Sequence, residues 1–230
     1  MTYPNAGGYA NAGLSSMEMA AVEWLDGFYS LEHLLCARMW VMKLCPEAPL
    51  EVRFAALVHD SERHFPGGPS STPSNGFDDP DYLFAHSTRS ADFVEEWLRN
   101  RSPALDNGFI QRVRRLVLRH EIGGGWDADF VQAADSLSFL ETLDWLTVDW
   151  VRSGRYTIEQ AREKLDFTVE RIRPSVAIAA ALPLYERAVR TLESAHDTTI
   201  DLQKRREIAS SRRLLLGLPL GPEESKAPIR

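Results

Sequence analysis

Helical periodicity is the feature that most constrains the fold of this chain. In almost every segment between the proline- and glycine-rich stretches, apolar residues recur at spacings of three and four, the pattern of amphipathic helices. The apolar–polar alternation of half-buried strands is not sustained anywhere, and no pair of strand-like runs flanks an Asn-Gly turn. We therefore expect an all-α fold.

Caps and breakers divide the first part of this pattern into separate helices. Ser16 is placed to cap a first helix, which Gly27 and Ser30 interrupt, so that a second helix is expected over residues 31–44. Pro49 lies in the first turn of the next helix, which ends at a His-Asp pair. The following helices are expected over residues 78–101, 106–121 and 127–154, and from Thr157 onward with interruptions at Pro174 and Pro183.

The stretch "FPGGPSSTPSNGFDDPD", residues 65–81, interrupts the helical pattern. Its glycines, prolines and serines are typical of an irregular loop, and it is long for a connection inside a compact domain. Because it follows the His-Asp pair at residues 59–60, we predict that it is a mobile lid over a site there. The alternative is a surface loop without such a role.

Length and composition are sufficient for one substantial core. With 230 residues and 44% hydrophobic content, the chain can form a single domain with an extension. We expect a flexible leader over residues 1–16, a helical domain over residues 17–200, and a C-terminal helix with a loose tail over residues 201–230. No internal repeat at a fixed period argues for a second domain.

Charge and targeting signals exclude several classes of partner. The net charge of −7 and the isoelectric point near 5.4 argue against nucleic acid, because nucleic-acid binders usually present a basic face. A small anionic substrate is compatible with this charge, since a bound metal supplies local positive charge. No membrane span or secretory signal is recognisable, so we expect a cytoplasmic protein in which Cys36 and Cys45 are reduced. The sequence does not indicate the oligomeric state.

Histidines are concentrated at comparable places on the expected helices. Of the six in the chain, His33, His59, His86 and His120 are flanked by apolar residues, which places them on the core side of their helices. One such histidine is usually a hydrogen-bonded core residue. Four of them, with Asp60 beside His59, need a common cause because an imidazole buried without a partner is costly. Imidazole and carboxylate ligands suit iron, manganese, cobalt or zinc, so we predict a metal centre.

Two aspartates complete the predicted centre. Asp60 can place one oxygen on each of two ions and so bridge them. Asp135 follows two alanines, whose small side chains allow its helix to approach the ions closely. Asp127 and Asp129 are alternatives to Asp135, but they lie at the helix start, where carboxylates act as caps.

These residues, in this order, resemble the HD-domain superfamily of helical metal-dependent phosphohydrolases. The shared pattern is a histidine, an adjacent His-Asp pair, two further histidines on later helices and a distal aspartate, and it covers about residues 28–145. The resemblance implies an HD-like helical bundle around a dinuclear metal centre, with additional C-terminal helices. It implies that one ion is bound by His33, His59, Asp60 and Asp135, and the other by His86, His120 and the second oxygen of Asp60. The interval between His120 and Asp135, which contains the glycine run, departs from the family by being short.

The resemblance also implies a reaction, the hydrolysis of a nucleotide or other small phosphate ester by a metal-bridged hydroxide. Asp60 would hold the two ions that position this nucleophile. Arg89, on nearly the same helix face as His86, is expected to neutralise charge on the phosphate, unless it forms a surface salt bridge to Asp92 or Glu96.

Two residues that follow the His-Asp pair are expected at the rim of the site. Arg63 would reach the substrate, and His64 would protonate a leaving group.

A second reaction uses the same ligands. The sequence also resembles HD-domain proteins that are mixed-valent di-iron oxygenases, which cleave C–C or C–P bonds with dioxygen. Tyr29, one helical turn before His33, is placed to gate the iron in such an enzyme. A third alternative is a metal-stabilised module without turnover. Iron or manganese is the expected metal, with cobalt, zinc or magnesium as alternatives.

Overall fold

The computed structural model describes residues 13–101 and 104–197. Helix α2 (Ser16–Trp24) belongs to a first unit, of which residues 13–26 are described. The other helices form a second unit that begins at Gly27 and contains all six predicted ligands. The expected leader lies almost entirely outside the described residues, and the expected C-terminal helix and tail lie wholly outside them.

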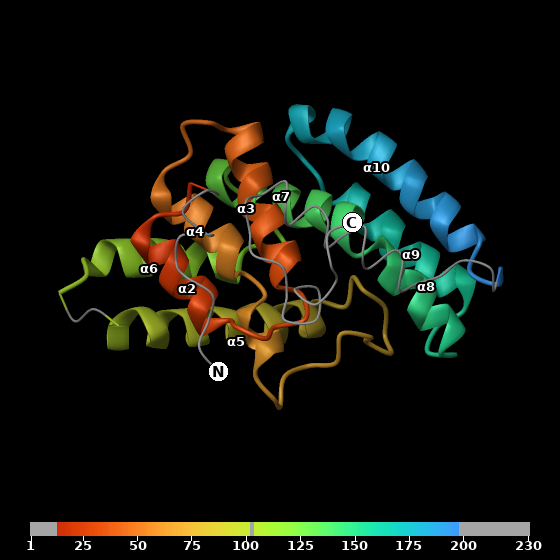
Figure 1. Cartoon of the computed structure of the whole chain (residues 1–230), viewed down its shortest axis with the longest axis horizontal. Coiled ribbons are helices and arrows are strands. Elements are labelled where there is room, and N and C mark those ends of the chain that lie inside the picture. Colours follow the sequence, from red (N-terminus) through yellow and green to blue (C-terminus); the bar gives the residue numbers. More distant parts are fainter. Residues whose placement is uncertain (1–12, 102–103, 198–230) are drawn as a thin grey trace, which may run out of the picture. The chain divides into compact units, whose positions relative to one another are not determined.

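Every regular element within the described ranges is helical, which confirms the all-α prediction (Figure 1). The elements of the second unit are α3 (Leu31–Leu44), α4 (Leu50–Val58), the 3₁₀ turn η1 (Ser61–His64), α5 (Pro80–Arg101), α6 (Asn107–Leu118), α7 (Trp126–Thr142), α8 (Asp144–Arg152), α9 (Ile158–Glu170) and α10 (Ser175–Glu193).

Helix starts follow the capping rules, with one shift. Helix α2 is capped by Ser15 and not by Ser16, because the Ser15 hydroxyl accepts from the backbone N–H of Glu18 and the Glu18 carboxylate accepts from the backbone of Ser15. Pro49 precedes α4, and Thr157 forms the same kind of capping box at the start of α9. Local sequence therefore sets these boundaries to within a residue.

Two expected boundaries are wrong. The single helix expected over residues 127–154 is divided into α7 and α8 at Leu143, whose ψ of 12° is outside the helical range. The carbonyl of Thr142 accepts from the indole N–H of Trp145, which stabilises this break. Pro183 does not interrupt the last helix but lies inside α10, on an exposed position where water can bind the carbonyl that its missing N–H leaves unpaired.

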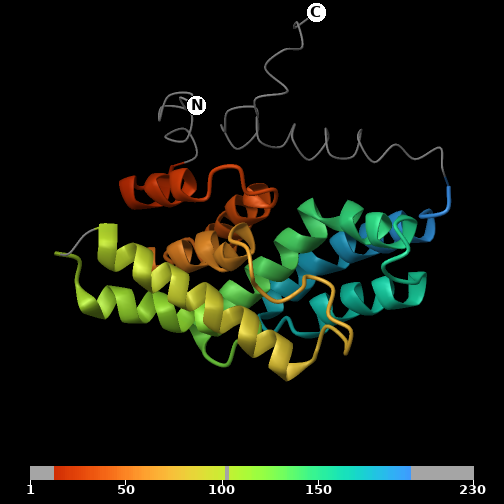
Figure 2. The same cartoon turned by 90° about the horizontal axis from the view of Figure 1, so that it is seen from below.

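Helices α3 and α7 form the centre of the second unit. Helix α3 packs on α7 and α4, and α4 also packs on α6 and α7. Helices α5 and α6 lie side by side, and α10 covers α7, α8 and α9 (Figures 1 and 2). The fully buried side chains of this core include Leu34, Phe54, Leu57, Leu137, Leu140 and Leu165. Helices that carry the predicted ligands thus converge because their apolar faces share one core.

Candidate metal centre

The structure brings all six predicted ligands together. His33 lies in the first turn of α3, His86 in the middle of α5 and Asp135 in the middle of α7. His59 is the residue that ends α4 and Asp60 follows it, while His120 lies in the turn after α6. The four histidines are at most 1% exposed. Each imidazole is therefore buried among protein atoms at the same place.

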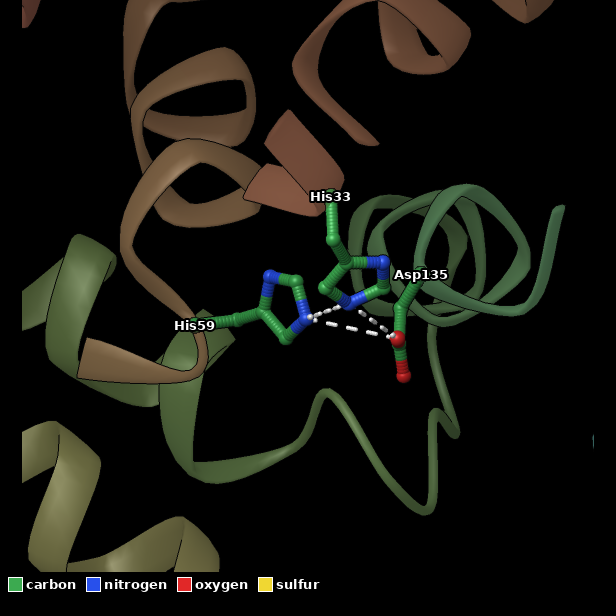
Figure 3. A group of neighbouring side chains, drawn as sticks. All are labelled: His33, His59 and Asp135. Carbon is green, nitrogen blue, oxygen red and sulfur yellow. Dashed lines mark hydrogen bonds and ion pairs between the residues drawn. The ribbon is translucent and has the colours of Figure 1, made fainter. Parts of the chain in front are cut away.

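His33, His59 and Asp135 form a first triad (Figure 3). The Nε2 atoms of His33 and His59 are 3.2 Å apart, and each is 3.3 Å from Oδ1 of Asp135. A point about 1.9 Å from all three atoms lies in the plane of this triangle, so an ion slightly above it reaches each at the usual metal–ligand distance of about 2.0–2.2 Å. The triad therefore has the dimensions of one face of a coordination shell.

Asp60, His86 and His120 form a second triad. Oδ1 of Asp60 is 2.9 Å from Nε2 of His86 and 3.7 Å from Nε2 of His120, and the two nitrogens are 3.2 Å apart. Asp60 also lies beside the first triad, with Oδ2 4.0 Å from Nε2 of His33 and Oδ1 4.0 Å from Nε2 of His59. Its carboxylate thus stands between the two groups of histidines.

Main-chain carbonyls orient two of the imidazoles. Nδ1 of His59 donates to the carbonyl of Ala56 at 2.9 Å, and Nδ1 of His120 donates to the carbonyl of Val117 at 2.6 Å. In both cases the acceptor is three residues earlier in the chain, so the local backbone fixes the ring. A proton held at Nδ1 leaves the lone pair of Nε2 available to a metal.

Side-chain oxygens orient the other two imidazoles. Nδ1 of His86 is 2.8 Å from Oε1 of Glu62, which can only accept when ionised. Nδ1 of His33 is 2.8 Å from Oγ of Ser138, and this hydroxyl donates to the carbonyl of Asp135, so it accepts from His33. All four histidines therefore hold Nδ1–H in a hydrogen bond and direct Nε2 into the centre. This is the arrangement that metal-binding histidines adopt.

The facing Nε2 atoms require a cation between them. With Nδ1 protonated in every ring, two neutral imidazoles 3.2 Å apart would point lone pairs at each other. Either an additional proton or a metal ion removes this repulsion. Burial lowers the pKa of His59, but Asp135 and Asp60 outweigh burial and raise that pKa to about 9. Burial and Arg63 likewise oppose protonation of His86, yet its pKa is raised, mainly by Asp60.

In the second triad the excess proton belongs to one ring only. Burial lowers the pKa of His120 to about 4, which keeps this imidazole neutral beside His86. Burial also opposes ionisation of Asp60 and Asp135, but the neighbouring cations hold the pKa of both carboxyls well below the usual range. Each triad thus combines an ionised carboxylate with an imidazole whose raised pKa favours an additional proton, in a place where a metal ion could bind.

Helix α9 contributes cations that the sequence analysis did not predict. Arg171, at the C-terminal end of α9, donates to Oδ2 of Asp135 at 2.5 Å and also binds the Glu121 carboxylate. Burial raises the pKa of Glu121, but Arg171 outweighs it, so that the pKa falls to about 2. Lys164 lies two turns before Arg171, and burial lowers its pKa to about 8. The available signal was that both basic residues share the buried face of an amphipathic helix.

Glu121, which follows His120, lies close to the centre. Its side chain is only 8% exposed, and its Oε1 is 3.8 Å from Nε2 of both His86 and His120. Together with His120 and Asp135 it makes a third group of possible ligand atoms. Glu121 is therefore a candidate additional ligand.

Arg89 does not face the centre as predicted, and it also does not pair with Asp92 or Glu96. Its Nε is 3.2 Å from Oε2 of Glu62, and its guanidinium donates to the carbonyl of Pro66 at 2.6 Å. The long side chain turns away from His86 because the Glu62 carboxylate, buried behind that ring, attracts it. Arg89 consequently positions Glu62 and the start of the loop.

A pocket opens beside the two triads. Its lining residues are Tyr29, Ser30, His33, Asp60, Arg63, Ser71, Tyr82, Glu121, Asp135, Phe139, Leu143, Leu146, Trp150, Lys164 and Arg171. Its free volume is about 50 Å³, which is room for a few water molecules. Ligand pockets of drug size need about 300–1,000 Å³, so the pocket in this conformation admits only a small chemical group.

Of the two residues predicted at the rim, only Arg63 lines the pocket. Its Nε is 3.6 Å from Oδ2 of Asp60, and its guanidinium donates to the Tyr82 hydroxyl at 2.7 Å. His64 instead packs its ring edge-on against Phe28 and Phe65.

The loop over residues 65–79 runs from η1 to α8 and back to α5 (Figures 1 and 2). Its Ser71 lines the pocket, and the Tyr156 hydroxyl donates to the carbonyl of Pro73 at 2.9 Å. The ring of Phe77 stacks on Trp150. The loop is therefore one wall of the pocket and is held by contacts near its middle and its end.

None of the helices in the described residues is long and apolar enough to cross a membrane. Comparison of the chain with protein-family models, with curated proteins and with solved structures finds no match. The site is therefore interpreted from its own geometry: buried histidines and carboxylates that could hold metal ions beside a pocket with cationic walls.

Proposed function

We propose that the second unit is an HD-type metal-dependent phosphohydrolase whose two triads bind two divalent transition-metal ions bridged by Asp60. One observation carries the proposal: four imidazoles with occupied Nδ1 atoms and two carboxylates place their free ligand atoms in adjacent triangles with sides of 2.9–3.7 Å. Nitrogen and carboxylate ligands of this kind favour iron, manganese, cobalt or zinc. Glu121 is available as a further ligand.

Charge supports an anionic substrate. The buried carboxylates near the centre are matched in number by cationic side chains: Asp60, Glu62, Glu121 and Asp135 on one side, and Arg63, Arg89, Lys164 and Arg171 on the other. Divalent ions therefore add positive charge that no side chain here compensates. A phosphate ester supplies the missing negative charge, and the small pocket favours a small ester over a nucleotide unless the loop opens.

Bound at the triads, the ions would supply an activated water and Lewis acidity toward the phosphate oxygens. The chain's own residues then perform two tasks. Arg63, anchored by Asp60 and Tyr82, presents its guanidinium to the pocket and neutralises charge on the non-bridging oxygens. The loop excludes bulk water from the pocket through Ser71.

Metal content and phosphate release test the proposal together. We expect protein reconstituted with Mn²⁺, Co²⁺ or Fe²⁺ to hold two ions per chain and to release phosphate from a panel of small phosphate monoesters. His33→Ala should lose at least one ion and reduce release at least about a hundredfold, since it removes a ligand of the first triad. His196→Ala is the matched control, because this exposed histidine lies after α10. Protein that binds no metal would refute the proposal.

A mixed-valent di-iron oxygenase that cleaves a C–C or C–P bond is the second candidate. The observation that favours it is Tyr29, which lines the pocket beside Ser30 and His33 and is 61% exposed. An exposed phenol at this position would regulate access to an ion bound by the first triad. Anaerobically reconstituted iron protein decides between the two: an electron paramagnetic resonance signal of coupled Fe(II)–Fe(III), with dioxygen uptake and no phosphate release, supports the oxygenase.

A further inference from the structure

Lys164 lies in the pocket without a carboxylate partner. Its Nζ is 5.1 Å from the ring centres of Phe77 and Phe139 and 5.3 Å from that of Phe167. Within the part of the chain that the structure describes, no carboxylate lies within ion-pair distance of this ammonium, although it lines the same pocket as the candidate ligands. Aromatic faces stabilise an ammonium group but leave its three donors without acceptors.

The position of Lys164 defines a second end of the pocket. Asp135 pairs with Arg171, and Phe139, one turn after Asp135 on α7, contacts Lys164, seven residues before Arg171 on α9. The two helices therefore run in opposite directions along the pocket. Seven helical residues separate the two backbone positions by about 10 Å, while the Lys164 ammonium and the Arg171 guanidinium each lie 5.3 Å from the ring centre of Phe167.

The walls around this second end are apolar. Leu143, Leu146 and Trp150 line the pocket beyond Phe139, and Phe77 of the loop stacks on Trp150. Glu121 and Asp135 act on the Lys164 ammonium from beyond ion-pair distance, so its hydrogen-bond donors remain available to an anionic ligand. Arg63 and Arg171, in contrast, already have carboxylate partners at the metal end.

We propose that Lys164 binds a second anionic group of the substrate, at the end of the pocket away from the metal ions. The substrate class is then a small phosphate ester or phosphonate that carries a carboxylate or a second phosphate on a short apolar linker, and the loop must move to admit it, because the free volume of about 50 Å³ accepts only a small chemical group. This inference rests on the proposed function, because the first anionic group is the one placed at the metal ions and Arg63. Phe77 and Ser71 bring the loop into contact with the same ligand.

Binding of three phosphonates to the full-length, Mn²⁺-loaded protein tests this assignment by calorimetry. Methylphosphonate has one anionic group, while phosphonoacetate and 3-phosphonopropionate add a carboxylate at increasing distance. We expect phosphonoacetate, 3-phosphonopropionate or both to bind at least about tenfold more tightly than methylphosphonate. Lys164→Met should abolish this gain, so that phosphonoacetate and 3-phosphonopropionate bind no more tightly to the variant than methylphosphonate does. Lys43→Met is the matched control, because it removes an exposed lysine that also lies over an aromatic ring, that of Trp40.

Failure of this inference differs from failure of the proposed function. Equal affinities of the wild-type protein for all three phosphonates would overturn the role of Lys164, and this comparison needs no variant to fold. An equal loss for all three in Lys164→Met would also overturn it, since a general electrostatic effect does not distinguish them. If the two carboxylate-bearing phosphonates bind and methylphosphonate does not, the result would support the role of Lys164. It would count against binding of the phosphate group at the metal ions. Absence of binding by every phosphonate would overturn both.

Discussion

Replacing Glu62 by glutamine should lower the affinity for the ion in the second triad and leave the affinity for the other ion unchanged. Oε1 of Glu62 lies 2.8 Å from Nδ1 of His86, and both side chains are at most 1% exposed. A glutamine oxygen can still accept this hydrogen bond but without its negative charge. Charge-assisted bonds contribute about 1.5–3 kcal/mol and neutral ones about 0.5–1.5 kcal/mol, so the loss is roughly 1–1.5 kcal/mol. We expect the dissociation constant of the ion in the second triad to rise about tenfold.

Stepwise titration of metal-free protein with Mn²⁺, followed by calorimetry, resolves the two dissociation constants. Ser138→Ala provides the complementary variant, because it removes the acceptor of His33 Nδ1 and leaves a buried N–H unpaired. That costs about 1–3 kcal/mol and should weaken the ion of the first triad between tenfold and a hundredfold. Thermal unfolding of each metal-free variant separates metal affinity from stability, since Glu62 also pairs with Arg89.

The result that refutes this reasoning is the absence of a distinction between the variants. If Glu62→Gln and Ser138→Ala weaken both ions equally, then the hydrogen bonds do not act on separate triads. If neither variant changes either dissociation constant, the Nδ1 partners of His86 and His33 do not orient metal ligands.

Four further predictions concern the same centre. Asp60→Ala should lose both ions, because it removes the negative charge between the triads, whereas His120→Ala should lower the affinity for mainly one ion. Metal analysis that finds two ions in Asp60→Ala would exclude a bridging role for Asp60. Since the pKa of His59 is raised to about 9, metal binding at pH 7.5 should release at least one proton, and the affinity for metal should increase as pH rises toward 9. Calorimetry in buffers of different ionisation enthalpy measures the number of protons released, and a value of zero would contradict the prediction. Gly68→Ala should weaken the same ion as Glu62→Gln in the Mn²⁺ titration, because a Cβ there would overlap the Glu62 carboxylate. Replacing residues 67–76 by a short Gly-Ser linker should keep the metals and reduce turnover at least about tenfold, or about 1.4 kcal/mol; unchanged turnover would leave the loop without a role as a lid.

The ligand set was predictable because each ligand has a local signature. His33 and His86 lie on the apolar faces of strongly periodic helices, and Asp135 follows two alanines on a helix that is buried along its length. Helical periodicity does not apply to His120 and Glu121, which lie in the turn after α6 ends at Leu118. For that reason both side chains reach the centre, although neighbours inside a helix would diverge.

Residues whose role depends on tertiary contacts were not predictable. Arg171 acts at the centre because α9 packs on α7, and nothing in the intervening sequence indicates that these helices are antiparallel neighbours. Arg89 was assigned from its spacing to His86, but its length allows it to turn back to Glu62. The break at Leu143 likewise depends on a backbone carbonyl that accepts from Trp145. Spacing gives the face of a helix, while packing decides which group a long side chain meets.

Charge balance connects the ligands, the cationic walls and the substrate. In the metal-free protein, the raised pKa values of His59 and His86 favour an additional proton on one imidazole beside each of the ionised carboxylates Asp135 and Asp60. Divalent ions that replace these protons increase the charge of each triad, in surroundings where burial makes an excess charge costly. Phosphate hydrolysis and the cleavage of a C–P bond both bring an anion to this position. The centre therefore favours an anionic substrate for either chemistry, and the redox state of the bound metal determines which reaction follows.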